Sequence, residues 1–460
     1  MLSKITIASV TALAGAGLAS AKKCPPTPQG SAIVDLTQKT GEAKAIGSGF
    51  IYGWPDNGTE VDNSLPEDLV WPIGFVACRA GGAQLPAPAT GWATGGYANY
   101  TGRFDSTLSN YRTTRKYGGD FILLPHDLWG ADGGLDGLYP GDDDDWTETE
   151  KFLHQVISDL KENDMLEGLV FDLWNEPDID SFWDRSWDQY LEYYIRAHEI
   201  VRKELPDTLI SGPSAASAPS LDSDKWNKWM DRISKEDAVP DIYSWHQIGD
   251  EQRQPDNSVP DFNTMRDTHN LPERPIDINE YAWPEAQNPA NTAWYLSQLE
   301  RHNLRGLRAN WGSGGELHDL MADLVYREDG EVKPNGEWYL YEYYAAMKGT
   351  RVKTTASEDL TFDAFAVTSD SGLKVIAGTR TVQAPYEVVV NGVSELGLPE
   401  VGSVQIRTIR FDYAGKATDT GPPKDLGLTE LSYSDDKLVI LSNPPTNWTG
   451  YAYELMTVSA

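Results

Sequence analysis

Basic residues, histidine and cysteine are scarce in this chain of 460 residues. Lys and Arg number 38 against 70 Asp and Glu, which gives a formal net charge of −32 and a pI near 4.5. Because phosphate and anionic lipid surfaces are bound by clustered Lys and Arg, this balance argues against nucleic acid or a membrane surface as partner. It also argues against polyuronates as substrates. The excess of acidic residues is explained by solubility in an acidic medium.

The chain has few side chains that could hold a metal ion. Its seven histidines and two cysteines form no cluster with the spacing of a metal site. The four consecutive acids of Asp142–Asp145 also lack the spacing of a calcium loop. We therefore expect neither metal nor cofactor. In an oxidising compartment Cys24 and Cys78 would form one disulfide, if the geometry allows it.

Long apolar runs are absent beyond the N-terminus. Residues 1–21 combine Lys4, an apolar region and the small residues Ala19-Ser20-Ala21, which is the layout of a secretory signal peptide. The segment is too short and too rich in Ala and Gly to span a membrane. We expect a secreted, extracellular monomer. The sequons that fit glycosylation begin at Asn57, Asn99 and Asn447.

A length of 460 residues predicts a large domain with a smaller companion. After a Pro-rich lead-in with one short strand at residues 22–45, short apolar runs alternate with helical segments over residues 46–350. This alternation predicts an α/β fold, a (β/α)8 TIM barrel. Residues 351–460 contain short alternating runs between turn residues, typical of an antiparallel β-sandwich domain. The barrel strands are expected at Ile46–Tyr52, Ile73–Arg79, Phe121–Leu124, Leu169–Trp174, Thr208–Gly212, Asp241–His246, Pro275–Tyr281 and Leu304–Trp311.

The fourth strand leads into the most informative stretch of the chain, GLVFDLWNEPDIDSFW at residues 168–183. Its apolar run is typical of a strand covered on both faces. Pro177 cannot donate to a strand ladder, so the strand ends before it and leaves Asn175 and Glu176 at its carboxyl end. In a barrel of parallel strands that end carries the active site. Glu176 is therefore a candidate general acid.

A second glutamate follows at the expected seventh strand. Pro275–Tyr281 reads PIDINEY and ends in Asn-Glu-Tyr, with Glu280 lying 104 residues after Glu176. Since one βα unit takes roughly 30 residues or more, three units fit between the two glutamates. Both would then lie on one rim of the barrel. Retaining glycosidases need two carboxyl groups about 5 to 5.5 Å apart, and this spacing permits such a pair.

These two motifs resemble glycoside hydrolase family 39 of clan A. FDLWNEPDIDSFW is similar to the acid/base strand and following loop of that family, and INEY resembles the nucleophile strand of the clan. The resemblance covers roughly residues 46–349. It implies a secreted, fungal-type, β-xylosidase-like enzyme, with Glu176 as acid/base and Glu280 as nucleophile. Where the family has Asn after the nucleophile's Tyr, this chain has Ala282, a departure that bears on the substrate rather than on the reaction.

The resemblance also implies supporting residues. Arg79 would assist the nucleophile, His246 would lie beside it, and Trp311 would stack on a sugar. For each of two residues a purely structural role remains open. Arg79 could form an ordinary ion pair, and His246 could be a buried core residue. The short strand of residues 22–45 would pair with the C-terminal domain. Further substrate-contact candidates are Asn175 for a 2-hydroxyl, His126 and Trp129 after the third strand, and Tyr281.

The reaction predicted on these grounds is retaining hydrolysis of β-glycosidic bonds in an oligo- or polysaccharide. Two alternatives stay open. One is an endo-acting glycanase of the same clan, with the same chemistry in a longer cleft. The other is a secreted carbohydrate-binding protein without catalysis, although a binding protein needs no pair of carboxyl groups at strand ends.

Overall fold

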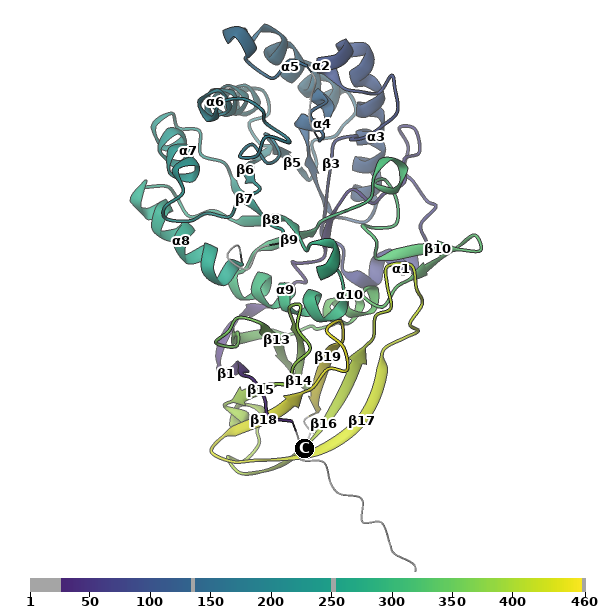
Figure 1. Cartoon of the computed structure of the whole chain (residues 1–460), viewed down its shortest axis with the longest axis vertical. Helices are drawn as coiled ribbons and strands as arrows, with labels where there is room; N and C mark the ends of the chain where they lie inside the picture. Colours follow the sequence, from purple (N-terminus) through teal and green to yellow (C-terminus); the bar gives the residue numbers. More distant parts are fainter. Residues whose placement is uncertain (1–25, 134–136, 250–253, 457–460) are drawn as a thin grey trace, which may run out of the picture.

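Eight parallel strands close into a barrel in the computed structural model, which describes residues 26–133, 137–249 and 254–456 (Figure 1). Each strand pairs with its sequence neighbours, and the last pairs with the first. The predicted TIM barrel is thus confirmed. In order, the strands are β2 (Gly49–Ile51), β3 (Ala77–Ala80), β4 (Asp120–Leu123), β5 (Leu169–Asp172), β6 (Leu209–Ala215), β7 (Ile242–Gln247), β8 (Ile276–Tyr281) and β9 (Arg305–Arg308).

Helices surround the barrel, and several start at positions that the sequence marks clearly. Ser186, Ser223 and Asn288 each accept a hydrogen bond from a backbone N–H in the first turn of the helix that follows. The helices are α1 (Glu67–Val70), α2 (Trp92–Gly95), α3 (Tyr97–Lys116), α4 (Pro125–Trp129), α5 (Thr147–Glu162), α6 (Trp187–Glu204), α7 (Asp224–Lys235), α8 (Pro255–Thr268), α9 (Pro289–His302) and α10 (Trp338–Ala345). No helix in the described ranges has the length and apolar character needed to cross a membrane.

The second domain is one nine-stranded sheet, and the predicted antiparallel β domain is confirmed. Its order is β17-β16-β19-β14-β13-β12-β1-β15-β18, and the end strands β17 and β18 approach each other, so the sheet wraps around one apolar core. The strands are β1 (Ser31–Glu42), β12 (Thr350–Thr355), β13 (Phe362–Ser369), β14 (Gly372–Thr379), β15 (Tyr386–Asn391), β16 (Gly402–Phe411), β17 (Lys424–Tyr433), β18 (Lys437–Ser442) and β19 (Gly450–Met456). A hairpin of β10 (Val325–Glu328) and β11 (Glu331–Pro334) belongs to the barrel domain.

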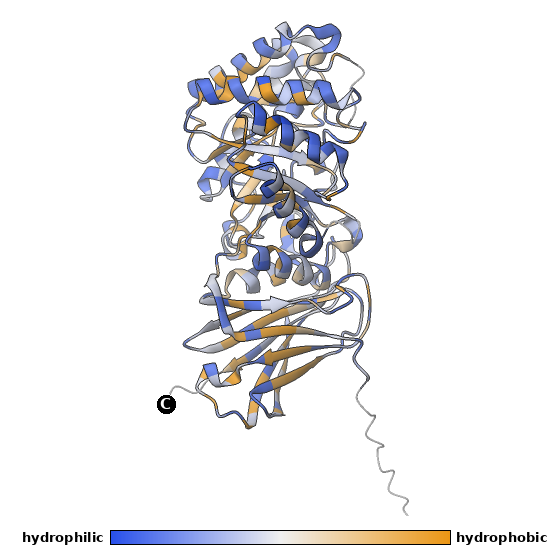
Figure 2. Ribbon diagram, turned by 90° about the vertical axis from the view of Figure 1, so that its left-hand side faces the viewer, coloured by the Kyte–Doolittle hydropathy of each residue, from blue (hydrophilic) through white to orange (hydrophobic). Residues whose placement is uncertain are grey.

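The N-terminal strand β1 lies inside this sheet, between β12 and β15. It runs parallel to β15 and antiparallel to β12, so the first described segment of the chain is built into the last domain. In Figure 2 the strands of the sheet are mainly hydrophobic, whereas the barrel helices alternate hydrophilic and hydrophobic residues. In both domains the buried hydrophobic residues gather in apolar cores.

The two domains share a packed interface. Helix α9 lies against β13 and β14, and Phe365 and Ile376 of those strands join the apolar core of the barrel. Arg301 of α9 binds Asp363 of β13 and, at 2.7 Å, Asp256 of α8. The sheet therefore supports the helix that follows the predicted nucleophile strand.

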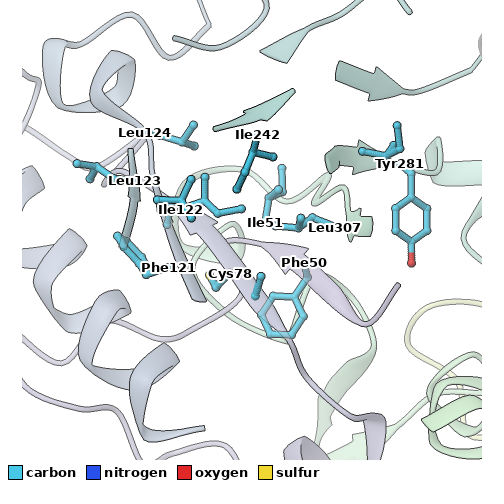
Figure 3. Close-up of a cluster of buried hydrophobic side chains, with 14 of the residues drawn as sticks. Phe50, Ile51, Cys78, Phe121, Ile122, Leu123, Leu124, Ile242, Tyr281 and Leu307 are labelled. Atoms are coloured by element: carbon cyan, nitrogen blue, oxygen red, sulfur yellow. The ribbon is translucent and has the colours of Figure 1, made fainter. Parts of the chain in front are cut away.

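Cys78 lies on β3 within the barrel core, where Figure 3 shows it among the side chains of Phe50, Phe121 and Ile122. It is fully buried, and burial raises the pKa of its thiol to about 12. Cys24 and the predicted signal peptide lie outside the described residues, so the disulfide and the leader stay predictions.

The three sequon asparagines differ in exposure. Asn57 is exposed, whereas Asn99 and Asn447 are partly buried. The Asn99 amide nitrogen donates to the Thr90 hydroxyl at 3.0 Å. Glycosylation at these positions stays a prediction.

The interface generates a stability prediction for Trp294 of α9. This side chain is fully buried, and its Nε1 donates to the Leu360 carbonyl at 2.9 Å. Trp294→Ala should lower the free energy of unfolding by about 3–5 kcal/mol, because it leaves a cavity between the domains. Urea unfolding followed by circular dichroism would measure this. Trp71→Ala is the control, since Trp71 is 54% exposed; equal losses in both variants would contradict a stabilising interface.

Candidate active site

Glu176 and Glu280 meet at the carboxyl ends of the barrel strands, with one histidine between them. Nδ1 of His246 lies 2.8 Å from Oε1 of Glu176 and 3.8 Å from Oε2 of Glu280. One oxygen of each carboxylate and a ring nitrogen of His246 all lie within 4.8 Å of one another. The barrel has thus brought together two carboxyl groups that are far apart in the chain.

The backbone holds Glu176 in an unusual conformation. Its φ is 43°, in the left-handed region that costs a non-glycine residue of order 1–3 kcal/mol. The backbone N–H of Glu176 donates to the Ser214 carbonyl on β6 at 2.9 Å. β5 ends at Asp172, four residues earlier. The turn therefore directs the Glu176 side chain across the rim rather than along the strand.

Arg79 ties three parts of the site together from beneath. Its side chain is fully buried, and Nη1 lies 2.8 Å from Oε1 of Glu280. Nη2 donates to Oδ1 of Asn175 at 2.8 Å, and Nε donates to Oδ2 of Asp172 at 2.9 Å. The side-chain oxygen of Asn175 accepts a hydrogen bond from Arg79. The NH₂ group of the same amide can therefore donate to a ligand in the cavity, which Asn175 lines.

Asp172 anchors a buried polar network under the two glutamates. Both of its oxygens accept hydrogen bonds from the Ser214 hydroxyl, and Oδ2 also accepts from Asn279 Nδ2 at 3.1 Å. The carboxylate supplies negative charge against buried Arg79. A buried charge with several partners avoids most of the penalty of losing water, and the network keeps the guanidinium in one orientation.

The surroundings act differently on the ionisable groups. Burial raises the pKa of Glu280 and the charge of Glu176 acts in the same direction, whereas His246 and Arg79 oppose the rise. Burial, followed by the charge of Arg79, lowers the pKa of His246 to about 4. His246 is therefore neutral near neutral pH, and its link to Glu176 is a hydrogen bond rather than an ion pair.

A cavity of about 280 Å³ opens directly above the carboxyl pair. Its walls are partly aromatic, and one side of Trp311 is braced by Trp283 with ring centroids 4.7 Å apart. The predicted residues that line it are Asn175, Glu176, Glu280, His126 and Trp311, and residues that sequence reasoning missed are Tyr52, Gln84, Asp127, Asp132, Phe182 and Asn310.

Two predicted substrate contacts lie away from the cavity. Tyr281 is fully buried behind the strand, where its hydroxyl donates to the Gly47 carbonyl at 2.8 Å and contacts Tyr341. The pairing of β8 with β7 shifts register between Ile278 and Glu280, so Asn279 and Glu280 both face the site while Tyr281 faces away. Trp129 is 2% exposed, and its Nε1 donates to the Leu138 carbonyl. Neither lines the cavity.

Arg79 and His246 hold the carboxylates from behind and do not line the cavity. His126 does line it, with Nε2 at 2.8 Å from Oδ1 of Asp127. Asp127 also accepts a hydrogen bond from the Tyr52 hydroxyl. Although burial acts against this, His126 and Tyr52 hold the pKa of Asp127 below its usual value. Asp127 directly follows His126 in the sequence, and this position could have identified it as a candidate site residue.

The set of Glu176, His246 and Glu280 also has a spacing at which a cation could be held. The ionic contact of Arg79 to Glu280 at 2.8 Å already supplies positive charge there. This contact occupies one carboxylate oxygen and opposes a second cation. The arrangement is better suited to proton transfer and nucleophilic attack by the carboxyl groups.

The chain is similar to known proteins only at low sequence identity. No protein-family model matches the chain. A 3-O-α-D-galactosyl-α-L-arabinofuranosidase from Bifidobacterium longum subsp. longum is 21% identical over 380 residues, 71% of this chain and 30% of the relative. A 3-O-β-L-arabinopyranosyl-α-L-arabinofuranosidase from Bifidobacterium pseudocatenulatum is 20% identical over 370 residues, 71% of this chain and 35% of the relative. The chain thus spans about a third of these curated relatives' length.

Solved structures share the fold across nearly the whole chain. N2152 from Neocallimastix frontalis superposes with a TM-score of 0.73 at 19% identity, covering 93% of this chain and 100% of the other. A GH39 enzyme from Xanthomonas axonopodis pv. citri gives 0.58 at 15% identity, with 96% and 100% covered. A GH30 endoxylanase from Clostridium papyrosolvens gives 0.56 at 12% identity, with 93% and 100% covered. At such identities the likeness shows the fold alone.

The site generates a prediction for Arg79. Arg79→Met should lower the free energy of unfolding by about 3–5 kcal/mol, because it leaves the carboxylates of Asp172 and Glu280 buried without their cation. Urea unfolding at neutral pH would measure the loss. The control is Lys235→Met, which breaks an exposed pair with Asp231 and should cost less than about 1 kcal/mol. Similar losses in both variants would show that the network does not depend on Arg79.

Proposed function

We propose that the protein is a retaining glycoside hydrolase that cleaves β-glycosidic bonds by double displacement. The observation that carries the proposal is the pair of carboxylates at the barrel rim, with oxygens within 4.8 Å under an aromatic-walled cavity. Inverting enzymes separate their carboxyl groups by about 6.5–9.5 Å to admit a water, whereas retaining enzymes use about 5–5.5 Å. The separation here supports attack by a carboxylate.

In the first step Glu176 donates its proton to the oxygen of the leaving group while Glu280 attacks the anomeric carbon. The glycosidic bond breaks, and an ester forms between the sugar and Glu280. In the second step Glu176 takes a proton from water, whose oxygen replaces the Glu280 carboxylate at the anomeric carbon. The enzyme regains both starting protonation states. Neutral His246, at 2.8 Å from Glu176, remains close enough to orient that carboxyl group in both steps.

Arg79 and Asn175 have complementary parts in this proposal. The guanidinium keeps Glu280 oriented and favours its ionised form against the effect of burial. The amide of Asn175, held by the same guanidinium, donates to the 2-hydroxyl of the sugar, a contact that strengthens as positive charge develops on the ring. Trp311 provides an apolar face for stacking against the sugar.

For the substrate we propose a β-xyloside or a related cell-wall saccharide, as expected for a GH39-like enzyme. An α-L-arabinofuranoside is the second candidate, because both curated relatives carry arabinofuranosidase in their names. The same proposal includes secretion and action as a monomer. Nitrophenyl β-D-xyloside and α-L-arabinofuranoside, assayed beside xylan and arabinan, would separate these substrates and exo from endo action.

Stereochemistry is the primary test. Because the carboxyl groups leave no room for an intervening water, the first product should keep the anomeric configuration of the substrate. Proton NMR spectra taken before mutarotation would show this. An activated 2-fluoro glycoside should also leave its sugar on the peptide that contains Glu280. The exposed Glu285 lies in the following loop, so Glu285→Gln should label normally while Glu280→Gln should not. A first product of inverted configuration would refute the mechanism.

A separate prediction concerns Glu176→Ala. A nitrophenyl glycoside has a good leaving group and needs little protonation, so formation of its glycosyl-enzyme should survive. A glycoside with an alkyl or sugar leaving group should lose roughly a further 10²–10⁴-fold in rate. Added azide should restore turnover of the nitrophenyl substrate and give a glycosyl azide. Equal losses on both substrates, without azide product, would point to another acid.

A further inference from the structure

A second indole ring lies next to Trp311 at the wall of the catalytic cavity. It belongs to Trp283, whose ring centroid lies 4.7 Å from that of Trp311 at an interplanar angle of 64°. Trp311 lines the cavity, whereas Trp283 lies outside the lining and is 45% exposed. The two rings therefore form one aromatic surface that begins in the cavity and continues outside it.

The backbone after the nucleophile strand sets the position of Trp283. β8 ends one residue before Ala282, whose φ of 73° is in the left-handed region and turns the chain sharply. A 3-10 turn, Pro284–Ala286, follows, and the Ala286 N–H donates to the Trp283 carbonyl at 2.8 Å. Nε1 of Trp311 donates to the Ala282 carbonyl at 3.0 Å. Both indoles are thus tied to the same short segment.

The segment is also anchored on its far side. Nε2 of Gln287 donates to the Ala309 carbonyl beyond β9 at 2.7 Å, and Nδ2 of Asn288 donates to the Glu285 carbonyl at 3.0 Å. Asn288 also caps α9. The exposed residues Trp283 and Glu285 therefore lie between two fixed ends, and little ordering of this loop is needed when a ligand contacts the indole.

Packing of the protein core does not account for the exposure of this ring. Ala282 and Ala286, on either side of it, are buried and hold the segment without the outer face of the indole. Trp71 and Trp448 are also exposed, but neither of their ring partners among the described residues lines the cavity. An exposed apolar surface that continues the wall of a cavity is typical of a ligand contact.

We propose that Trp283 binds a second sugar ring of the substrate, bonded to the ring that lies over Glu176 and Glu280. The catalytic cavity, at about 280 Å³, is just below the range of about 300–1,000 Å³ typical of drug-sized ligands. A second ring of the same substrate therefore extends out of the cavity, where Trp283 offers the next aromatic face. This inference rests on the proposed function and narrows the substrate to a saccharide of two or more rings.

The chemistry of an exposed indole suits a neutral sugar ring. One face of such a ring carries C–H groups and stacks on the flat apolar indole, while the hydroxyl groups stay in water. Glu285, exposed two residues after Trp283, and the net charge of −32 disfavour an acidic sugar at this position. The contact therefore selects for the presence of a second ring rather than for an ionic group.

Calorimetric titration of the full-length Glu280→Gln variant, which should bind saccharides without turnover, tests the proposal. The probes are D-xylose, xylobiose, L-arabinose and α-1,5-arabinobiose, and one disaccharide should bind more tightly than its monosaccharide. Adding Trp283→Leu keeps an apolar contact to Trp311 but removes the flat ring, and should lower this ratio of affinities about tenfold. Trp283→Phe should retain most of the ratio. The control is Trp71→Leu, which changes an indole that is 54% exposed and lies outside the cavity lining, and should leave the ratio unchanged.

A ratio that Trp283→Leu leaves unchanged would overturn the proposal. So would equal losses for the monosaccharide and the disaccharide, because Trp283 would then act only by bracing Trp311. Failure of either disaccharide to bind more tightly than its monosaccharide, or to bind at all, would also overturn it. If circular dichroism shows that Glu280→Gln does not fold, Glu176→Gln serves as the background. The expected fall in the ratio, without hydrolysis of any glycoside by the wild-type protein, would refute the proposed function and leave the second ring site intact.

Discussion

The fully buried guanidinium of Arg79 is the interaction on which the rest of the site depends. It reaches from β3 to the carboxylates of Asp172 and Glu280 and to the amide of Asn175. Its three N–H directions are set by one planar group, so the three partners have a fixed relative geometry. A lysine could supply the charge but not this geometry. The cost of burying the cation is offset by two carboxylates that themselves need a partner.

The proposed chemistry requires two adjacent carboxyl groups to behave differently, and the surroundings provide the asymmetry. Glu280 contacts the permanent cation of Arg79, whereas Glu176 contacts a histidine that burial keeps neutral. A neutral imidazole can donate or accept a hydrogen bond, and so accommodates both protonation states of an acid/base. A permanent cation favours only the ionised state, as a nucleophile needs.

The β domain contributes to the barrel through α9. This helix follows the nucleophile strand and packs on β13 and β14, while β1 joins the first described residues to the same sheet. Opening the interface would expose Trp294 and separate Arg301 from Asp363. The two domains are thus coupled by apolar burial and by a buried ion pair. The sheet has an apolar core of its own, and some of its residues also belong to the apolar core of the barrel.

Local patterns in the sequence were sufficient for the order of the barrel strands and the class of both domains, and they placed Glu176 and Glu280 near the carboxyl ends of β5 and β8. Hydrophobic runs record burial on both faces, and Pro177 marks the end of a strand, so these features depend on neighbours in the chain. The direction of Tyr281 was not encoded locally, because the register of β8 shifts before Glu280 and regular alternation from Asn279 would point Tyr281 inward. Only the closed barrel decided that Arg79 contacts residues from β5 and β8 and that Tyr52 meets Asp127. Those contacts join residues from different elements, and their geometry is set by strand register and side-chain packing, which no local pattern contains.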